Sequence, residues 1–184
     1  MYEHLNSLKE KLLKLKVESP SKPWQRIACT TVGGLRSVGF DRHSDNLLIV
    51  SDWGRGVVDC CTGEKTARDY EEYYVNEEYL EAEGIGDLKG KTIKMAGLFG
   101  GGLPTSTIDG WQLKSVTLNF PEKMILLVEP GSDLYGSVYK RADNFIKVEH
   151  DAEIRAYGFS YTGKSFIIAT TSDVTIYARE DIGQ

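Results

Sequence analysis

The sequence predicts a mainly β protein built from repeated antiparallel hairpins, with one amphipathic helix near the N-terminus. From Trp24 onward the apolar runs are short, rich in β-branched and aromatic residues, and separated by Gly, Asp, Asn and Pro turns. Three segments of eighteen residues in this region align with one another without a gap. We therefore expect a domain of repeated hairpin units, and a two-sheet sandwich is the alternative arrangement.

Length and composition favour a folded domain of ordinary size. The chain has 184 residues, of which 41% are hydrophobic and 10% aromatic, enough apolar surface to offset the entropy of folding. A net charge of -5 disfavours nucleic acid as a partner, because phosphate binding requires clustered Lys and Arg. The sequence contains no apolar leader and no membrane-length apolar stretch, so we expect a cytoplasmic protein without a membrane partner.

The N-terminal helix is predicted from apolar residues at spacings of three and four, with charged residues largely on its other faces. These apolar residues are Leu5, Leu8, Leu12 and Leu15, within residues 2–17. Pro20 and Pro23 end the helix and open a linker. We therefore expect an N-terminal helix over residues 1–19 and a single β domain over residues 24–184.

Each aligned segment contains a strand, a polar turn and a second apolar run, which is the pattern of a β-hairpin. The segments are LRSVGFDRHSDNLLIVSD from Leu35, LKSVTLNFPEKMILLVEP from Leu113 and IRAYGFSYTGKSFIIATT from Ile154. The second begins 78 residues after the first, and the third begins 41 residues after the second. The longer interval has room for a divergent unit between Lys65 and Gly110, so we expect about four units.

A further strand follows the first and third hairpins, in SDWGRGVVDCCTGEK and SDVTIYARED. A strand with a small polar turn, an apolar strand and a short strand before a TGE-type turn resembles the blade of a WD-repeat or related β-propeller. The resemblance is strongest in SYTGKSFIIATTSDVTIYAR, covers the three aligned units, and implies a small or incomplete propeller-like fold. The chain departs from the family because no Trp-Asp pair ends a strand and no Gly-His pair opens a unit.

Residues 97–105, GLFGGGLPT, are glycine-rich, as phosphate-binding loops are. The Lys-Ser or Lys-Thr pair of such loops is missing, and turn residues follow in place of a helix. We therefore interpret this segment as a connection between strands, with Phe99 and Leu103 exposed at its tip and suited to a protein contact.

The histidines and cysteines predict no metal or cofactor site. His4, His43 and His150 lie at no ligand spacing from other ligand-type residues. The adjacent Cys60 and Cys61 point to opposite faces of a strand, which predicts one buried and one exposed reduced thiol.

The most informative segment for function is DYEEYYVNEEYLEAE, residues 69–83, with seven carboxylates, four tyrosines and no basic residue. Such a surface attracts a basic partner at long range and offers aromatic anchors. A solvated acidic helix or loop whose tyrosines cover the core is the alternative. The predicted partner-binding residues are Glu71, Glu72, Tyr73, Tyr74, Glu77, Glu78, Tyr79 and Phe99.

These observations favour a non-enzymatic, protein-binding function. A short acidic domain with divergent blade-like units is also similar to bacterial immunity proteins, which neutralise toxins, and this resemblance implies a basic toxin as partner. One alternative is a scaffold or adaptor that associates through an exposed leucine face over residues 5–15. Another is an unrecognised hydrolase using Asp109, Asp133 or His150, although the sequence contains no nucleophile elbow.

Overall fold

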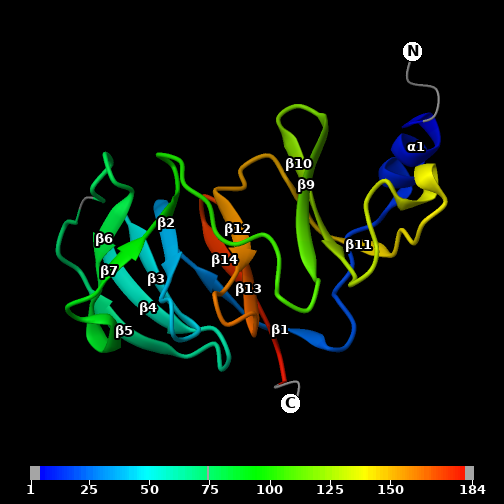
Figure 1. Cartoon of the computed structure of the whole chain (residues 1–184). Coiled ribbons are helices and arrows are strands. Elements are labelled where there is room, and N and C mark those ends of the chain that lie inside the picture. Colours follow the sequence, from blue (N-terminus) through cyan, green and yellow to red (C-terminus); the bar gives the residue numbers. More distant parts are fainter. Residues whose placement is uncertain (1–4, 74, 181–184) are drawn as a thin grey trace. The chain divides into compact units, whose positions relative to one another are not determined.

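The computed structural model describes residues 5–73 and 75–180, and these form a mainly β chain with one α-helix near the N-terminus (Figure 1). The chain divides into two compact units. The small unit contains Met1–Pro20 and Thr105–Ala152, and the large unit contains Ser21–Pro104 and Glu153–Gln184. This division differs from the predicted helix and single β domain. The helix packs on a sheet, and in the sequence the residues of that sheet interrupt those of the large unit.

The small unit is a three-stranded antiparallel sheet in the order β11-β10-β9, with helix α1 packed against it. Its elements are α1 (Asn6–Lys14), β9 (Gln112–Asn119), β10 (Glu122–Val128), the 3₁₀-helix η3 (Gly136–Tyr139) and β11 (Phe145–Asp151). An ion pair of 2.7 Å between Lys11 Nζ and Asp143 Oδ2 joins the helix to the segment before β11.

The leucine face of α1 is buried in the small unit. Leu8 and Leu12 contact the apolar face of the sheet. Their neighbours include Met124, Leu126, Val128, Leu134 and Phe145. The prediction of an exposed leucine face available for self-association is therefore wrong, because the sheet already covers that face.

The large unit contains two large antiparallel sheets, in the orders β5-β4-β3-β2-β8 and β1-β14-β13-β12, and a small sheet, β6-β7. Its elements are β1 (Trp24–Thr31), β2 (Leu35–Phe40), β3 (Asn46–Ser51), β4 (Gly54–Asp59), β5 (Lys65–Asp69), β6 (Glu81–Glu83), η2 (Gly86–Leu88), β7 (Thr92–Lys94), β8 (Ala96–Gly97), β12 (Ala156–Phe159), β13 (Ser165–Ala169) and β14 (Asp173–Arg179).

One apolar layer is shared by the two large sheets. In Figure 1, strands β2 and β3 of the first sheet are blue to cyan, and strands β12 to β14 of the second are orange to red. It includes Val38, Phe40, Leu47, Ile49 and Val58 from one sheet and Ile167, Ala169, Val174 and Ile176 from the other. Face-to-face packing of this kind buries the inward-pointing residues of both sheets. The sheets of the described residues do not close into a propeller.

All three predicted hairpins form, as β2–β3, β9–β10 and β12–β13. The first and third share one register, since the Phe40–Leu47 pair and the Phe159–Phe166 pair occupy the same aligned positions. The middle hairpin has a tighter turn and a different register, with Asn119 opposite Glu122. The fourth unit predicted between Lys65 and Gly110 is replaced by the short β6–β7 hairpin, which covers the outer face of the first large sheet.

The turns of the first and third hairpins are joined by a buried carboxylate. Asp45 accepts hydrogen bonds from the Ser165 hydroxyl at 2.6 Å and from the Thr162 hydroxyl at 2.8 and 2.9 Å. Burying a carboxylate destabilises the folded state unless the carboxylate is hydrogen-bonded, and these two hydroxyl groups supply the hydrogen bonds. The result is a polar link between the two sheets at the end of their apolar layer.

Replacing Leu12 with alanine is expected to lower the free energy of unfolding by roughly 2–5 kcal/mol, because the change leaves a cavity between α1 and the sheet. The adjacent Leu13 provides a matched control, since Leu12 is 3% exposed and Leu13 is 58% exposed. Leu13→Ala should change stability by less than about 0.5 kcal/mol. Urea denaturation followed by circular dichroism measures both, and equal effects would contradict the burial of this face.

Candidate functional site

The acidic segment, residues 69–83, is a loop from the end of β5 to β6, and we call it the acidic loop. It contains no helix among its described residues. Its two ends lie close together, which is the geometry of an Ω-loop, a compact surface loop packed by its own side chains.

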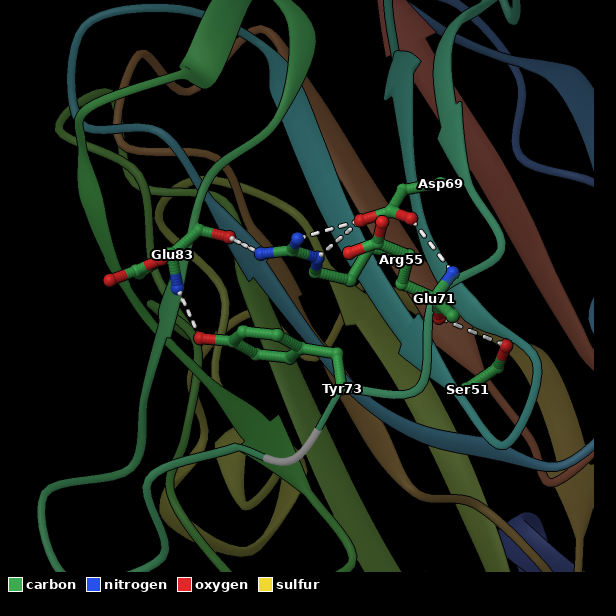
Figure 2. Close-up of polar contacts among 7 residues, drawn as sticks. Ser51, Arg55, Asp69, Glu71, Tyr73 and Glu83 are labelled. Carbon is green, nitrogen blue, oxygen red and sulfur yellow. Dashed lines mark hydrogen bonds and ion pairs between the residues drawn. The ribbon is translucent and has the colours of Figure 1, made fainter.

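One guanidinium group fixes both ends of the acidic loop (Figure 2). Arg55 of β4 binds Asp69 Oδ2 at 2.6 Å through Nη2 and at 3.3 Å through Nε, and its Nη1 donates to the Glu83 carbonyl at 3.0 Å. The guanidinium also lies 4.0 Å from the centre of the Tyr73 ring, whose hydroxyl accepts the Glu83 N–H at 2.8 Å. The Glu71 N–H and then Arg55 hold the pKa of Asp69 below its usual value.

Further contacts fix the middle of the acidic loop. The side chain of Val75 is buried in the apolar cluster beneath β6 and β7. Lys94 Nζ pairs with Glu81 Oε1 at 2.6 Å and donates to the Tyr79 carbonyl at 3.3 Å. The Asn76 side-chain oxygen accepts the Tyr79 N–H at 3.2 Å. The described residues of the loop from Val75 to Glu81 are therefore held by contacts within the loop and with the strands beneath it.

The structure divides the predicted partner-binding residues of this loop into two groups. Four glutamates are exposed. These are Glu71, Glu72, Glu77 and Glu78. Tyr79 is 59% exposed, as expected of an anchor. Tyr73 is half-buried beneath Arg55 and is not an exposed anchor, and Tyr74 lies outside the described residues.

The glycine-rich segment contains one exposed and one buried apolar side chain. Phe99 is exposed, as predicted, but Leu103 is buried in the apolar layer between the large sheets, so its prediction as an exposed tip is wrong. The backbone also passes close to β8 at Gly101, which has a φ of +82°. A Cβ atom there would lie 2.2 Å from the Met95 carbonyl oxygen, so only glycine fits.

Two residues of the hydrolase alternative, Asp133 and His150, make local structural contacts. His150 lies in β11, and its Nε2 is 3.4 Å from Glu122 Oε2. Asp133 Oδ1 accepts the Tyr135 N–H at 2.8 Å within a loop turn. Neither contact is a pairing of a nucleophile with a base.

The two adjacent cysteines differ in environment as predicted, with Cys60 buried and Cys61 exposed. Desolvation, and then the negative charges of Asp45 and Asp59, raise the pKa of Cys61 to about 11. Burial likewise raises the pKa of Cys60. Both thiols are therefore protonated and poorly nucleophilic near neutral pH.

Beside the acidic loop, the large unit has a groove with a volume of about 490 Å³ that sequence reasoning missed. Trp53 and Tyr70 lie in its lining and are 70% and 81% exposed. Arg68 lies 4.8 Å from the Tyr70 ring centre and donates to the Trp53 carbonyl at 2.7 Å. The available clue was a Trp at a tight turn between two strands, where Gly, Asn and Asp are the usual residues.

Comparison with protein-family models gives no match, and a search of curated proteins finds no relative. Within residues 5–73 and 75–180, no three His, Cys, Asp or Glu side chains form a group that could hold a metal ion. No helix in the described part of the chain has both the length and the apolar character needed to cross a membrane.

Replacing Arg55 with methionine is expected to free the ends of the acidic loop, because its bonds to Asp69 and Glu83 are lost together. Amide hydrogen exchange within residues 70–83 should accelerate by at least about tenfold, as in a segment that opens locally. Arg55→Lys keeps the charge but loses the forked geometry and should give an intermediate increase. Exchange measured by mass spectrometry tests this, with the exposed Arg26→Met as control, and unchanged exchange in Arg55→Met would contradict the clamp.

Alkylation of Cys61 should be slow in the folded protein. Its pKa is raised from an ordinary value of 9.0 to about 11, so at pH 8 the thiolate fraction falls about a hundredfold. Iodoacetamide labelling followed by peptide mass spectrometry should therefore show a rate that rises on unfolding in urea and increases with pH above 8. Equal rates in folded and unfolded protein at pH 8 would contradict this prediction.

Proposed function

We propose that this chain is a non-enzymatic protein-binding protein that contacts a basic partner through the acidic loop. The observation that carries this proposal is the combination of a clamped loop backbone with exposed carboxylates. Arg55 and Lys94 bind the inner carboxylates of Asp69 and Glu81, while the four exposed glutamates face solvent. A loop fixed before binding loses little conformational entropy when a partner docks.

The charge of the loop supports a basic partner. The exposed Glu71, Glu72, Glu77 and Glu78 lie within eight residues of one another, so their fields add at the surface. Such a field accelerates encounter with a positively charged surface and weakens as salt screens it. Tyr79, exposed in the same loop, supplies an aromatic contact of the kind that concentrates binding energy.

The partner class that fits this surface best is a basic toxin, so an immunity role is the finer form of the proposal. A toxin that acts on nucleic acid needs a positively charged active site to hold phosphates. Rigid carboxylates at similar spacing can occupy such a site in place of phosphates. This finer form is supported by the charge of the loop and by the resemblance in the sequence.

A pull-down with tagged protein tests the proposal. In lysate of the native cells, we expect a basic partner to be retained at low salt and released at high salt. The triple variant Glu71→Lys, Glu77→Lys and Glu78→Lys should lose that partner, because the attraction becomes repulsion.

The control makes the same charge change elsewhere, at the exposed Glu10, Glu18 and Glu129. Partner retention by this control and loss by the loop variant would locate the contact on the acidic loop. Equal retention by both variants, measured by quantitative mass spectrometry, would contradict the proposal.

A further inference from the structure

The groove beside the acidic loop lies where both large sheets of the large unit end. Its lining includes residues 30–33, from the end of β1 and the turn after it, and residues 65–68 of β5. Strands β1 and β5 are the terminal strands of their sheets. A terminal strand presents unpaired backbone N–H and C=O groups, which an extended peptide can pair with as an additional strand.

A glycine in the neighbouring strand leaves room in the groove. Gly56 of β4 lies opposite Arg68 of β5 and opposite Ile49 of β3. A Cβ atom added at Gly56 would have its nearest neighbour, the Ala67 carbonyl oxygen, at 3.6 Å, an ordinary contact distance. The space above this strand is therefore not required for packing of the sheet.

The charges of the groove are opposite in sign to those of the acidic loop. Among the residues that line it, Lys65 and Arg68 carry charge and none is acidic. Lys65 is exposed, and the ion pairs found among the described residues do not include it. A carboxylate on an occupant would therefore meet two cations without displacing an internal ion pair.

Aromatic side chains add apolar contact area at the groove. Trp53, Tyr70 and Arg68 belong to the three residue types that are most enriched where binding energy concentrates. Arg68 is held in place by the Trp53 carbonyl and the Tyr70 ring, so the three side chains form one preformed surface. Large aromatic side chains left exposed together indicate a contact surface rather than part of the core.

We propose that this groove binds an extended peptide segment that carries a carboxylate, docked as an additional strand along β5 with its carboxylate at Lys65 and Arg68. Alternate side chains of such a strand point to one face and would enter the groove beside Trp53 and Tyr70. The groove shares Tyr70 with the acidic loop but is opposite to it in charge, and the glutamates that carry the proposed function do not line it, so the inference does not rest on the proposed function.

Selection from a phage-displayed library of random decapeptides on the purified protein tests the inference. Enriched peptides should alternate apolar with other residues and contain at least one Asp or Glu. They should fail to bind Gly56→Val, whose side chain fills the groove at a position where its Cβ fits. Circular dichroism establishes that this variant is folded.

A charge exchange provides a test that does not alter packing. Lys65→Glu should weaken binding of an enriched acidic peptide by at least about fivefold, and replacing the acidic residue of that peptide with Lys should restore binding to the variant. The exposed Lys89→Glu makes the same charge change outside the groove and should leave binding unaltered.

Three results would overturn the inference. One is a selection that enriches no peptide, and another is enriched peptides that bind Gly56→Val and Lys65→Glu as well as the parent. The third is enrichment of basic peptides that are lost in the Glu71, Glu77 and Glu78 triple variant, which would support the acidic loop alone. If the parent protein retains no basic partner in the pull-down but still binds acidic peptides, the proposed function is contradicted and the groove inference is supported.

Discussion

The antiparallel pairing of β1 with β14 is the constraint on which the large unit depends. It joins residues Trp24–Thr31 to Asp173–Arg179, from distant parts of the chain, and so makes β1 the terminal strand of the second large sheet. Closing so long a loop costs chain entropy, which must be offset by burial. The Trp24 ring provides part of that burial, at 5.0 Å from the ring centre of Phe166.

Two different interactions then hold the large sheets together. The apolar layer stabilises the packing of the two sheets through the hydrophobic effect, which has no preferred direction. The hydrogen bonds from Thr162 and Ser165 to the Asp45 carboxylate are directional, and they fix one turn against the other. Directional bonds of this kind favour one register among the many that apolar packing alone would allow. The shared register of the first and third hairpins is consistent with this, because both carry the turns that the link joins.

Strand β5 connects the two candidate binding surfaces of the large unit. Its end at Asp69 is clamped by Arg55 and begins the acidic loop, while Lys65 and Arg68 on the same strand line the groove. The loop therefore carries its negative charge on a backbone fixed by the sheet, as binding loops commonly do. Under the two proposals, opposite charges on either side of this strand would separate an acidic occupant from a basic one.

The sequence by itself determined the strand-turn-strand units, the N-terminal helix and the opposed environments of Cys60 and Cys61. These depend on alternation, turn residues and helical spacing, which are properties of neighbouring residues. Tertiary structure decided that the leucine face of α1 is covered, that Tyr73 is an internal support while Tyr79 is exposed, and that a groove lies beside β5. The physical reason is distance along the chain: Arg55 fixes a carboxylate 14 residues away and a carbonyl 28 residues away, and no local pattern records such a contact.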